Sequence, residues 1–142
     1  MKTRQIISAI AMAMVIIFSA TGCEQDNKTL LTDGIWNFKT MTADTEDETT
    51  QDLVLLAKAL MTESTMEFQE DGTYILNSPL MEEPSTGTWS LIGDDQLVLT
   101  PEGDAVNPPA SIQVLTRDEL KYIETSYDLS QNPYSLTTSW TK

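Results

Sequence analysis

The chain has 142 residues, of which 22 are acidic and 8 basic, so its formal net charge at pH 7 is −14. It has no histidine and a single cysteine, Cys23, so it lacks the groups for imidazole catalysis, an intrachain disulfide and the usual zinc sites. Such an acidic chain also lacks the basic surface that nucleic acids require, so its charge predicts no nucleic-acid partner. The sequence shows no motif for a metal or another cofactor, and none is expected.

The amino terminus predicts a secretory signal peptide over residues 1–22. Lys2 and Arg4 precede an apolar run from Ile6 to Phe18, and the small residues "SATG" follow it. This run is shorter than the roughly 20 residues that cross a bilayer as a helix. The order of charged, apolar and small residues therefore indicates a segment that is removed on export. No second apolar run follows, so the sequence predicts no transmembrane span.

Cys23 ends this segment, in the sequence Ala20-Thr21-Gly22-Cys23. The stretch resembles a lipobox, the bacterial signal in which a cysteine thiol receives a diacylglycerol and becomes the first residue after cleavage. A buried free cysteine is the alternative, because free cysteines mostly behave as small hydrophobic residues. Since polar residues follow Cys23, lipidation is the favoured interpretation. The acyl chains would hold the protein at a membrane, because each buried methylene contributes about 0.8 kcal/mol.

Residues 23–33 are short and mainly polar, and they predict a flexible tether between the lipid and a folded domain at residues 34–142. In this domain, short segments of alternating apolar and polar residues are separated by turn residues, as in an all-β barrel or sandwich. The first segment, "GIWNFKTM" (34–41), places Trp36 and Phe38 on one face.

The next element is an amphipathic helix, expected over residues 50–61. Thr49 and Asp52 stand in the capping-box relation at its start. Its sequence has two adjoining apolar faces: Leu53, Leu56 and Leu60, then Val54, Ala57 and Met61. An amphipathic helix usually buries its apolar face, so we expect it to plug the barrel or cover its side. A lid over the barrel mouth and a contact with a partner or membrane are the alternatives.

Three hairpins follow the helix. The Asp71-Gly72 pair in the first is typical of a type I′ turn, whose two central residues have positive φ. The second turns at residues 93–95 ("GDD"). The facing apolar residues expected in the three hairpins are Met66 and Phe68 with Tyr74 and Leu76, Trp89 and Leu91 with Leu97 and Leu99, and Ile112 and Val114 with Leu120 and Tyr122.

The last segment, "LTTSWTK" (136–142), has Leu136 and Trp140 as its candidate inward residues. The total is eight strands and one helix, mostly in hairpins between neighbours. Because an eight-stranded antiparallel sheet can close on itself and remove its edges, the pattern predicts an up-and-down β-barrel with one short helix after the first strand.

Four phrases in this order resemble a known family: "GIWNF", "MEFQEDGTY", "GTWSL" with "DDQLVLT", and "IQVLTRDELKY". Behind a lipobox, and over about residues 30–142, they resemble the small lipocalin-like lipoproteins of Gram-negative gut and oral bacteria. The resemblance implies an eight-stranded lipocalin-like barrel, lipid-anchored in the cell envelope, at the periplasmic face of the outer membrane or on the cell surface. It implies no particular ligand, because a fold does not fix a function.

Six aromatic residues are the candidate ligand-binding residues: Trp36, Phe38, Tyr74, Trp89, Tyr122 and Trp140. The interior of an eight-stranded barrel is barely wide enough for side chains, so packing is their favoured role and ligand contact the alternative. Trp36 resembles the tryptophan that closes the base of lipocalin barrels. The acidic residues at positions 44–48 lack the spacing of an EF-hand and predict solvated charge.

The sequence thus predicts a non-catalytic envelope lipoprotein that binds a small apolar molecule or a peptide segment at the open end of its barrel. This end is expected near the helix and near loops 78–86, 101–110 and 126–134. A second hypothesis is an accessory subunit or inhibitor that docks on an envelope protein through an exposed apolar patch. An enzyme is the third, since no pair among the 22 acidic residues stands out as catalytic.

Overall fold

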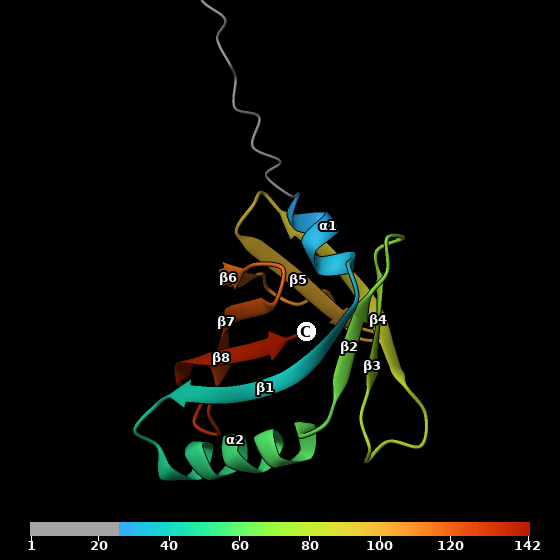
Figure 1. Ribbon diagram of the computed structural model, residues 1–142. Helices are drawn as coiled ribbons and strands as arrows, with labels where there is room; N and C mark the ends of the chain where they lie inside the picture. Colours follow the sequence, from blue (N-terminus) through green and yellow to red (C-terminus); the bar gives the residue numbers. More distant parts are fainter. Residues whose placement is uncertain (1–25) are drawn as a thin grey trace, which may run out of the picture.

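The computed structural model describes residues 26–142, so the predictions for the signal peptide and for lipidation of Cys23 lie outside the described residues. The described chain forms a closed barrel in which each strand pairs with its neighbour in the sequence (Figure 1). The first and last strands also pair with each other, and every pairing is antiparallel. The expected eight-stranded up-and-down barrel is therefore confirmed.

In the described part of the chain, two helices accompany the eight strands, and α2 follows the first strand as expected. The helices are α1 (Asn27–Thr32) and α2 (Glu48–Met61). The strands are β1 (Ile35–Asp44), β2 (Thr65–Phe68), β3 (Thr73–Asn77), β4 (Ser85–Ile92), β5 (Gln96–Pro101), β6 (Ala110–Leu115), β7 (Glu119–Tyr127) and β8 (Pro133–Thr141). Neither helix is long and apolar enough to cross a membrane, as far as residues 26–142 are concerned.

The core is built from inward side chains of the strands together with Leu31 of α1. The largest side chains with almost no solvent contact include Trp36, Trp140 and Phe68. Aromatic rings meet edge to face at 5.5 Å between centroids in two places: Phe38 with Trp140, and Phe68 with Trp89. Such pairs add roughly 0.5–1.5 kcal/mol to the area that they bury.

The flexible tether predicted for residues 23–33 is wrong for residues 27–32, which form α1. This helix lies across one end of the barrel (Figure 1), where Leu31 is fully buried. The indole Nε1 of Trp36 donates a hydrogen bond to the carbonyl oxygen of Leu31 at 2.9 Å. The Lys142 ammonium lies 4.5 Å from the Trp36 ring centroid and donates to the carbonyl oxygen of Leu30 at 3.1 Å. These contacts fix α1 to the barrel base.

Helix α2 begins two residues earlier than expected, because Asp47 caps it and not the predicted pair of Thr49 and Asp52. The Asp47 carboxylate accepts hydrogen bonds from the backbone nitrogen of Thr50 at 2.7 Å and from its hydroxyl at 2.6 Å. A carboxylate at this position satisfies an amide that has no partner within the helix.

Of the two adjoining apolar faces predicted for α2, one packs against the barrel as expected and the other is exposed. The face of Val54 turns toward β1, against which α2 packs, and Val54 is buried. The other predicted face is not covered: Leu53, Leu56 and Leu60 are each about half exposed. Periodicity identifies which residues share a face, but it does not say how wide a face the barrel covers.

The register within the hairpins confirms the predicted pairs with one exception. Met66 pairs with Leu76 and Trp89 with Leu99, as expected. In the third hairpin a bulge shifts the register after Ile112, so that Leu115 and not Val114 stands opposite Leu120. The extra residue of a bulge moves every later side chain to the other face.

The first hairpin turn differs in type from the predicted one. Gly72 has φ of +88°, but Asp71 has no positive φ, which excludes a type I′ turn. The Gln69 amide donates to the carbonyl oxygen of Thr73 at 2.8 Å, and the Gly72 amide donates to that of Gln69 at 3.1 Å. These bonds describe a three-residue loop with the left-handed glycine of a G1 bulge.

The two ends of the barrel have different connections, because alternate turns of an antiparallel meander lie at the same end. One end carries α1 and the tight turns β2–β3, β4–β5 and β6–β7. The other end, here called the open end, carries α2 and loops 78–84, 102–109 and 128–132. Figure 1 shows α1 and α2 at opposite ends of the molecule.

Candidate ligand-binding site

The strand pairing is weakest between β5 and β6, and this weakness shapes the candidate site. Only two residue pairs join these strands, Gln96 with Ser111 and Leu97 with Ala110. Beyond them β5 continues to Pro101, while loop 102–109 leaves the sheet and ends in two prolines. Proline has no amide hydrogen to donate to a strand ladder, so the pairing stops there. The diverging segments leave two hollows beside the loop.

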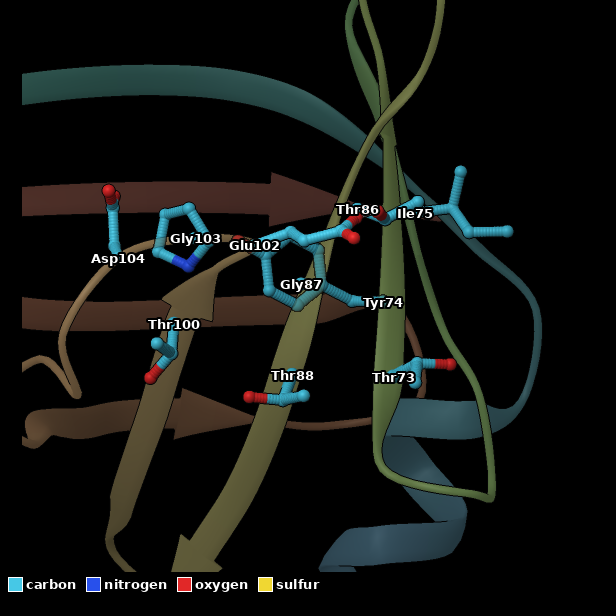
Figure 2. A pocket seen from close by; sticks show the side chains of 11 residues that line it. Thr73, Tyr74, Ile75, Thr86, Gly87, Thr88, Thr100, Glu102, Gly103 and Asp104 are labelled. Atoms are coloured by element: carbon cyan, nitrogen blue, oxygen red, sulfur yellow. Dashed lines mark hydrogen bonds between the residues drawn. The ribbon is translucent and has the colours of Figure 1, made fainter.

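The larger hollow is a cleft of about 600 Å³ formed by β3, β4, β5 and the start of loop 102–109. Its lining includes Tyr74, Gly87, several threonines, Glu102 and Asp104. The Thr86 hydroxyl donates a hydrogen bond to the Glu102 carboxylate, which ties the loop to β4. In Figure 2, Tyr74 reaches from β3 across β4, while Thr73 and Ile75 point the opposite way.

The absence of a side chain at Gly87 allows this position of Tyr74. A Cβ atom at Gly87 would stand 2.6 Å from Cε1 and Cζ of the Tyr74 ring and would also clash with the carbonyl oxygen of Thr100. Gly87 has no positive φ, so the requirement here is space and not backbone conformation. The ring therefore lies directly on the β4 backbone and forms a wall of the cleft.

The smaller hollow, here called the loop cavity, has a volume of about 180 Å³ and lies between loop 102–109 and the strands. The side-chain Nδ2 of Asn107 donates a hydrogen bond to the carbonyl oxygen of Leu99 at 2.8 Å. This bond holds loop 102–109 over the loop cavity. The loop cavity shares Tyr74 and Pro101 with the cleft, so the two hollows adjoin. Its lining residues are Tyr74, Leu97, Leu99, Pro101, Asn107, Pro108, Ala110 and Glu124.

Glu124 is the charged residue of this lining. It follows Leu120 and Tyr122 at every second position of β7, and both of those side chains are buried in the core. Burial raises the pKa of the Glu124 carboxyl group above its ordinary value, because a charged carboxylate loses solvation there. Among residues 26–142, no side chain forms an ion pair or a hydrogen bond with this carboxylate.

Two phenols lie in the same region. Burial raises the pKa of Tyr122, and the nearby carboxylate of Glu124 raises it further. The Tyr122 hydroxyl accepts a hydrogen bond from Nε1 of Trp140 at 3.4 Å. The pKa of Tyr74 is also raised, first by burial and then by the charge of Asp104. Both phenols are therefore protonated at neutral pH, and each has a hydroxyl hydrogen to donate.

The structure gathers the six predicted aromatic residues into one core, but only Tyr74 lines the cleft and the loop cavity. Five of them are buried, and Phe38 packs against them. Trp36 closes the base under α1, as its resemblance to the lipocalin tryptophan implied. Trp89 donates from Nε1 to the carbonyl oxygen of Gln69 at 2.9 Å, which fixes its indole beside the first hairpin.

Sequence reasoning missed Glu124 and the roles of Leu97, Leu99 and Ala110 in the lining. A signal for Glu124 was present, because the alternation Leu120, Tyr122, Glu124 places the carboxylate inward. No sequence signal indicated the hollows, since they depend on where β5 and β6 separate. Among residues 26–142, the acidic residues at positions 44–48 included, no group of three or more candidate metal ligands lies close together.

Comparison with known proteins gives a matching family model and matching solved structures, one of which is described here. A family model described as a lipocalin-like domain matches residues 32–122. The crystal structure of a DUF4847 family protein from Bacteroides vulgatus at 1.00 Å resolution is similar with a TM-score of 0.45 and 12% sequence identity, covering 76% of this chain and 93% of that one. No curated protein sequence matches the chain significantly. Since the family model spans more than half of the chain, from α1 into β7, the protein belongs to the family of lipocalin-like domains.

Proposed function

We propose that this protein is a non-catalytic, lipid-anchored envelope protein that binds a small, largely apolar molecule at the open end of its barrel. The observation that carries this proposal is the pair of adjoining hollows beside loop 102–109, with volumes of about 600 and 180 Å³. Sites for small molecules commonly enclose roughly 300–1,000 Å³ and are lined mainly by apolar side chains with a few polar groups. The two hollows together have this size, and the loop cavity has this mainly apolar lining.

The core argues against a site deeper in the barrel. Trp36, Phe68, Leu97 and Trp140 are almost fully buried and fill the interior toward α1. A ligand would therefore contact the rim of the core, where Tyr74 and Leu99 border the loop cavity, and would not replace the tryptophans.

The lipid anchor is proposed on sequence grounds. Residues 20–23 resemble a lipobox behind a signal peptide, and membrane attachment would follow from a diacylglycerol on Cys23. The outer membrane is the proposed location because the phrases of the barrel resemble lipoproteins of Gram-negative bacteria.

Native mass spectrometry of the full chain, purified from membranes in mild detergent, tests both parts. We expect loss of residues 1–22, a diacylglycerol on Cys23 and a second, non-covalent adduct. Leu99→Trp, which fills the loop cavity, should reduce the adduct, whereas Ile92→Trp at the exposed α1 end should not. A protein that retains no small molecule and takes none up from an envelope lipid extract would contradict ligand binding. An unmodified Cys23 would contradict the anchor alone.

A second function, docking on a protein partner, is favoured by the leucines of α2. Leu53, Leu55, Leu56 and Leu60 are between 48% and 61% exposed, which is unusual for four large apolar residues on one short helix. The neighbouring loop 78–84 adds Leu80 and Met81, which are also exposed. These six residues are here called the leucine patch.

The charges near the leucine patch indicate the chemistry of such a partner. Glu48, Asp52 and Glu63 are exposed at or near the ends of α2, and Lys58 is the helix's one basic residue. Carboxylates in these positions disfavour an anionic bilayer and favour an apolar surface that carries lysine or arginine. We therefore propose a basic, amphipathic protein segment as the partner.

Titration with designed helical peptides tests this second function. A leucine–lysine amphipathic helix should bind, and the matching leucine–glutamate helix should not. Leu53→Ser with Leu56→Ser should abolish binding, while the control pair Ile35→Ser and Ile92→Ser, exposed away from α2, should leave it intact. Equal binding by both protein variants would contradict the leucine patch as the docking surface.

A further inference from the structure

We propose that the ligand of the loop cavity carries a cationic nitrogen and that the carboxylate of Glu124 binds it. This inference rests on the proposed function, because it names the chemical class of the molecule that the open end would hold. It narrows "small and largely apolar" to an amine or another organic cation with an apolar portion.

The position of Glu124 is the first argument. Alternation along β7 turns this side chain inward, and it lines the loop cavity together with Leu97, Leu99 and Ala110. The other lining residues of the loop cavity are neutral. A ligand there would therefore meet one charged group, of negative sign, surrounded by apolar walls and one phenol ring.

The lack of a partner is the second argument. The six basic residues in the described part of the chain line neither the cleft nor the loop cavity: Lys28, Lys39, Lys58, Arg117, Lys121 and Lys142. A partly buried carboxylate without a counter-charge loses solvation, and no favourable electrostatic interaction compensates for the loss, so its ionised form destabilises the folded protein. A cationic ligand would supply the missing charge and form a charge-assisted hydrogen bond.

The charges around the loop cavity also favour a cationic ligand over an anionic one. Glu102 and Asp104 line the adjoining cleft, so the approach to the loop cavity is also negative. An acidic protein raises the local concentration of cations and disfavours fatty acids and other carboxylates. The ring of Tyr74 lines both hollows, and aromatic faces attract cations within about 6 Å of the ring centroid.

Three probes that differ only in their polar end test the inference: 2-phenylethylammonium, 2-phenylethanol and phenylacetate. Binding to the full chain is measured by calorimetry at physiological ionic strength. We expect the ammonium to bind at least about tenfold more tightly than the alcohol, the ratio expected for one charge-assisted hydrogen bond, and phenylacetate to bind most weakly.

Two variants of the same strand locate the effect. Glu124→Gln should remove the preference for the ammonium, and Glu119→Gln, at an alternate position of β7 facing the other way, should keep it. Thermal melting verifies that both variants fold, and the comparison of probes on the unaltered chain needs no variant. If the alcohol binds as tightly as the ammonium, the inference is overturned and the proposed function stands. If none of the three probes binds, the inference is also overturned, and the small-molecule function is then decided separately by the adduct in native mass spectrometry.

Discussion

Gly87 and Tyr74 depend on each other, because the phenol ring occupies the space that any larger residue at position 87 would need. Gly87→Ala places a methyl group 2.6 Å from the ring and against the β5 backbone, so Tyr74 must move away from its place in the cleft wall. We expect a loss of about 1–3 kcal/mol in the free energy of unfolding, as for other overpacked sites, measured by urea denaturation.

A control for this change is Gly103→Ala, in loop 102–109, where a Cβ atom would meet nothing within 4 Å. Its positive φ of +88° still gives alanine a conformational cost. The two variants therefore make the same glycine-to-alanine change, but at Gly103 the added methyl group contacts no other atom. If Gly87→Ala leaves stability and ligand affinity unchanged while Gly103→Ala lowers stability, the close approach of Tyr74 to β4 is contradicted.

The Glu124 carboxylate should lower stability at neutral pH. Its pKa in the folded protein is raised above the ordinary value of 4.5, so folding disfavours its ionised form. The penalty is complete above the raised pKa, where both states are ionised, and it disappears below the unfolded value, where both are protonated. Glu124→Gln should therefore raise the midpoint of thermal unfolding at about pH 7.5 and have little effect at about pH 4.

This comparison needs melting curves of the two proteins at both pH values, without ligand. An equal difference at both pH values would contradict desolvation as the cause. A variant that is stabilised yet loses its preference for ammonium probes would show that the carboxylate costs stability and serves binding, a trade-off common at functional sites.

At the level of secondary-structure elements, α1 should contribute to the stability of the barrel core and not merely precede it in the chain. Leu31→Ala removes a fully buried side chain of α1, whose backbone carbonyl accepts the hydrogen bond of Trp36, and should cost about 2–5 kcal/mol. Lys28→Ala changes an exposed residue of the same helix and should cost little. Chemical denaturation of the two variants measures the difference. Similar stability of both would contradict the docking of α1 against the barrel.

The elements also show what the sequence can predict. Strand pairs such as Trp89 with Leu99 follow from alternation and from short turns, and these were predicted correctly. The bulge after Ile112 adds one residue without changing the pattern of residue types, so alternation alone could not reveal it. Helix α1 was missed because six residues are too few to show a period, and its one signal was the adjacent pair Leu30 and Leu31 in a polar stretch.

The candidate site was less predictable than the fold for a related reason. The sequence could identify inward aromatic residues, and five of the six are buried. It could not say which of them border empty space, because that depends on the separation of β5 from β6 and on loop 102–109. Exposure of Leu53 and Leu56 was equally hidden, since it depends on the area of α2 that β1 covers.

At the scale of the whole molecule, the two barrel ends differ in surface character. Of the exposed large hydrophobic residues within positions 26–142, two lie away from the open end, Ile35 and Ile92. The others lie on α2, next to it, or in or beside the open-end loops: Leu53, Leu55, Leu56, Leu60, Leu80, Met81, Val106, Tyr127 and Leu129. Exposed apolar surface gathered at one end is typical of a binding face.

If Cys23 carries the proposed lipid, this difference between the two ends predicts how the barrel is oriented at the membrane. Because α1 holds the chain at the end opposite the hollows, a lipid on Cys23 should place the β4–β5 turn near the bilayer and loop 128–132 away from it. With Cys23 acylated, fluorescent labels on Asp94→Cys and Ser130→Cys report the two ends. Spin-labelled lipids in vesicles should quench the first label more strongly than the second. Equal quenching of both labels would contradict this orientation.

The docking of α1 also sets how far the barrel can travel. A chain extends by at most about 3.5 Å per residue. A linker from Cys23 to Asp26, the residue before α1, would therefore span at most about 10 Å. A linker that stayed unstructured as far as Asp33 would span about 35 Å. With a lipid on Cys23, the shorter linker would keep the barrel within a thin layer above the bilayer, where it would diffuse laterally with the lipid. Encounters with other membrane-bound molecules would then occur in two dimensions, at a fixed height and with the same face always presented.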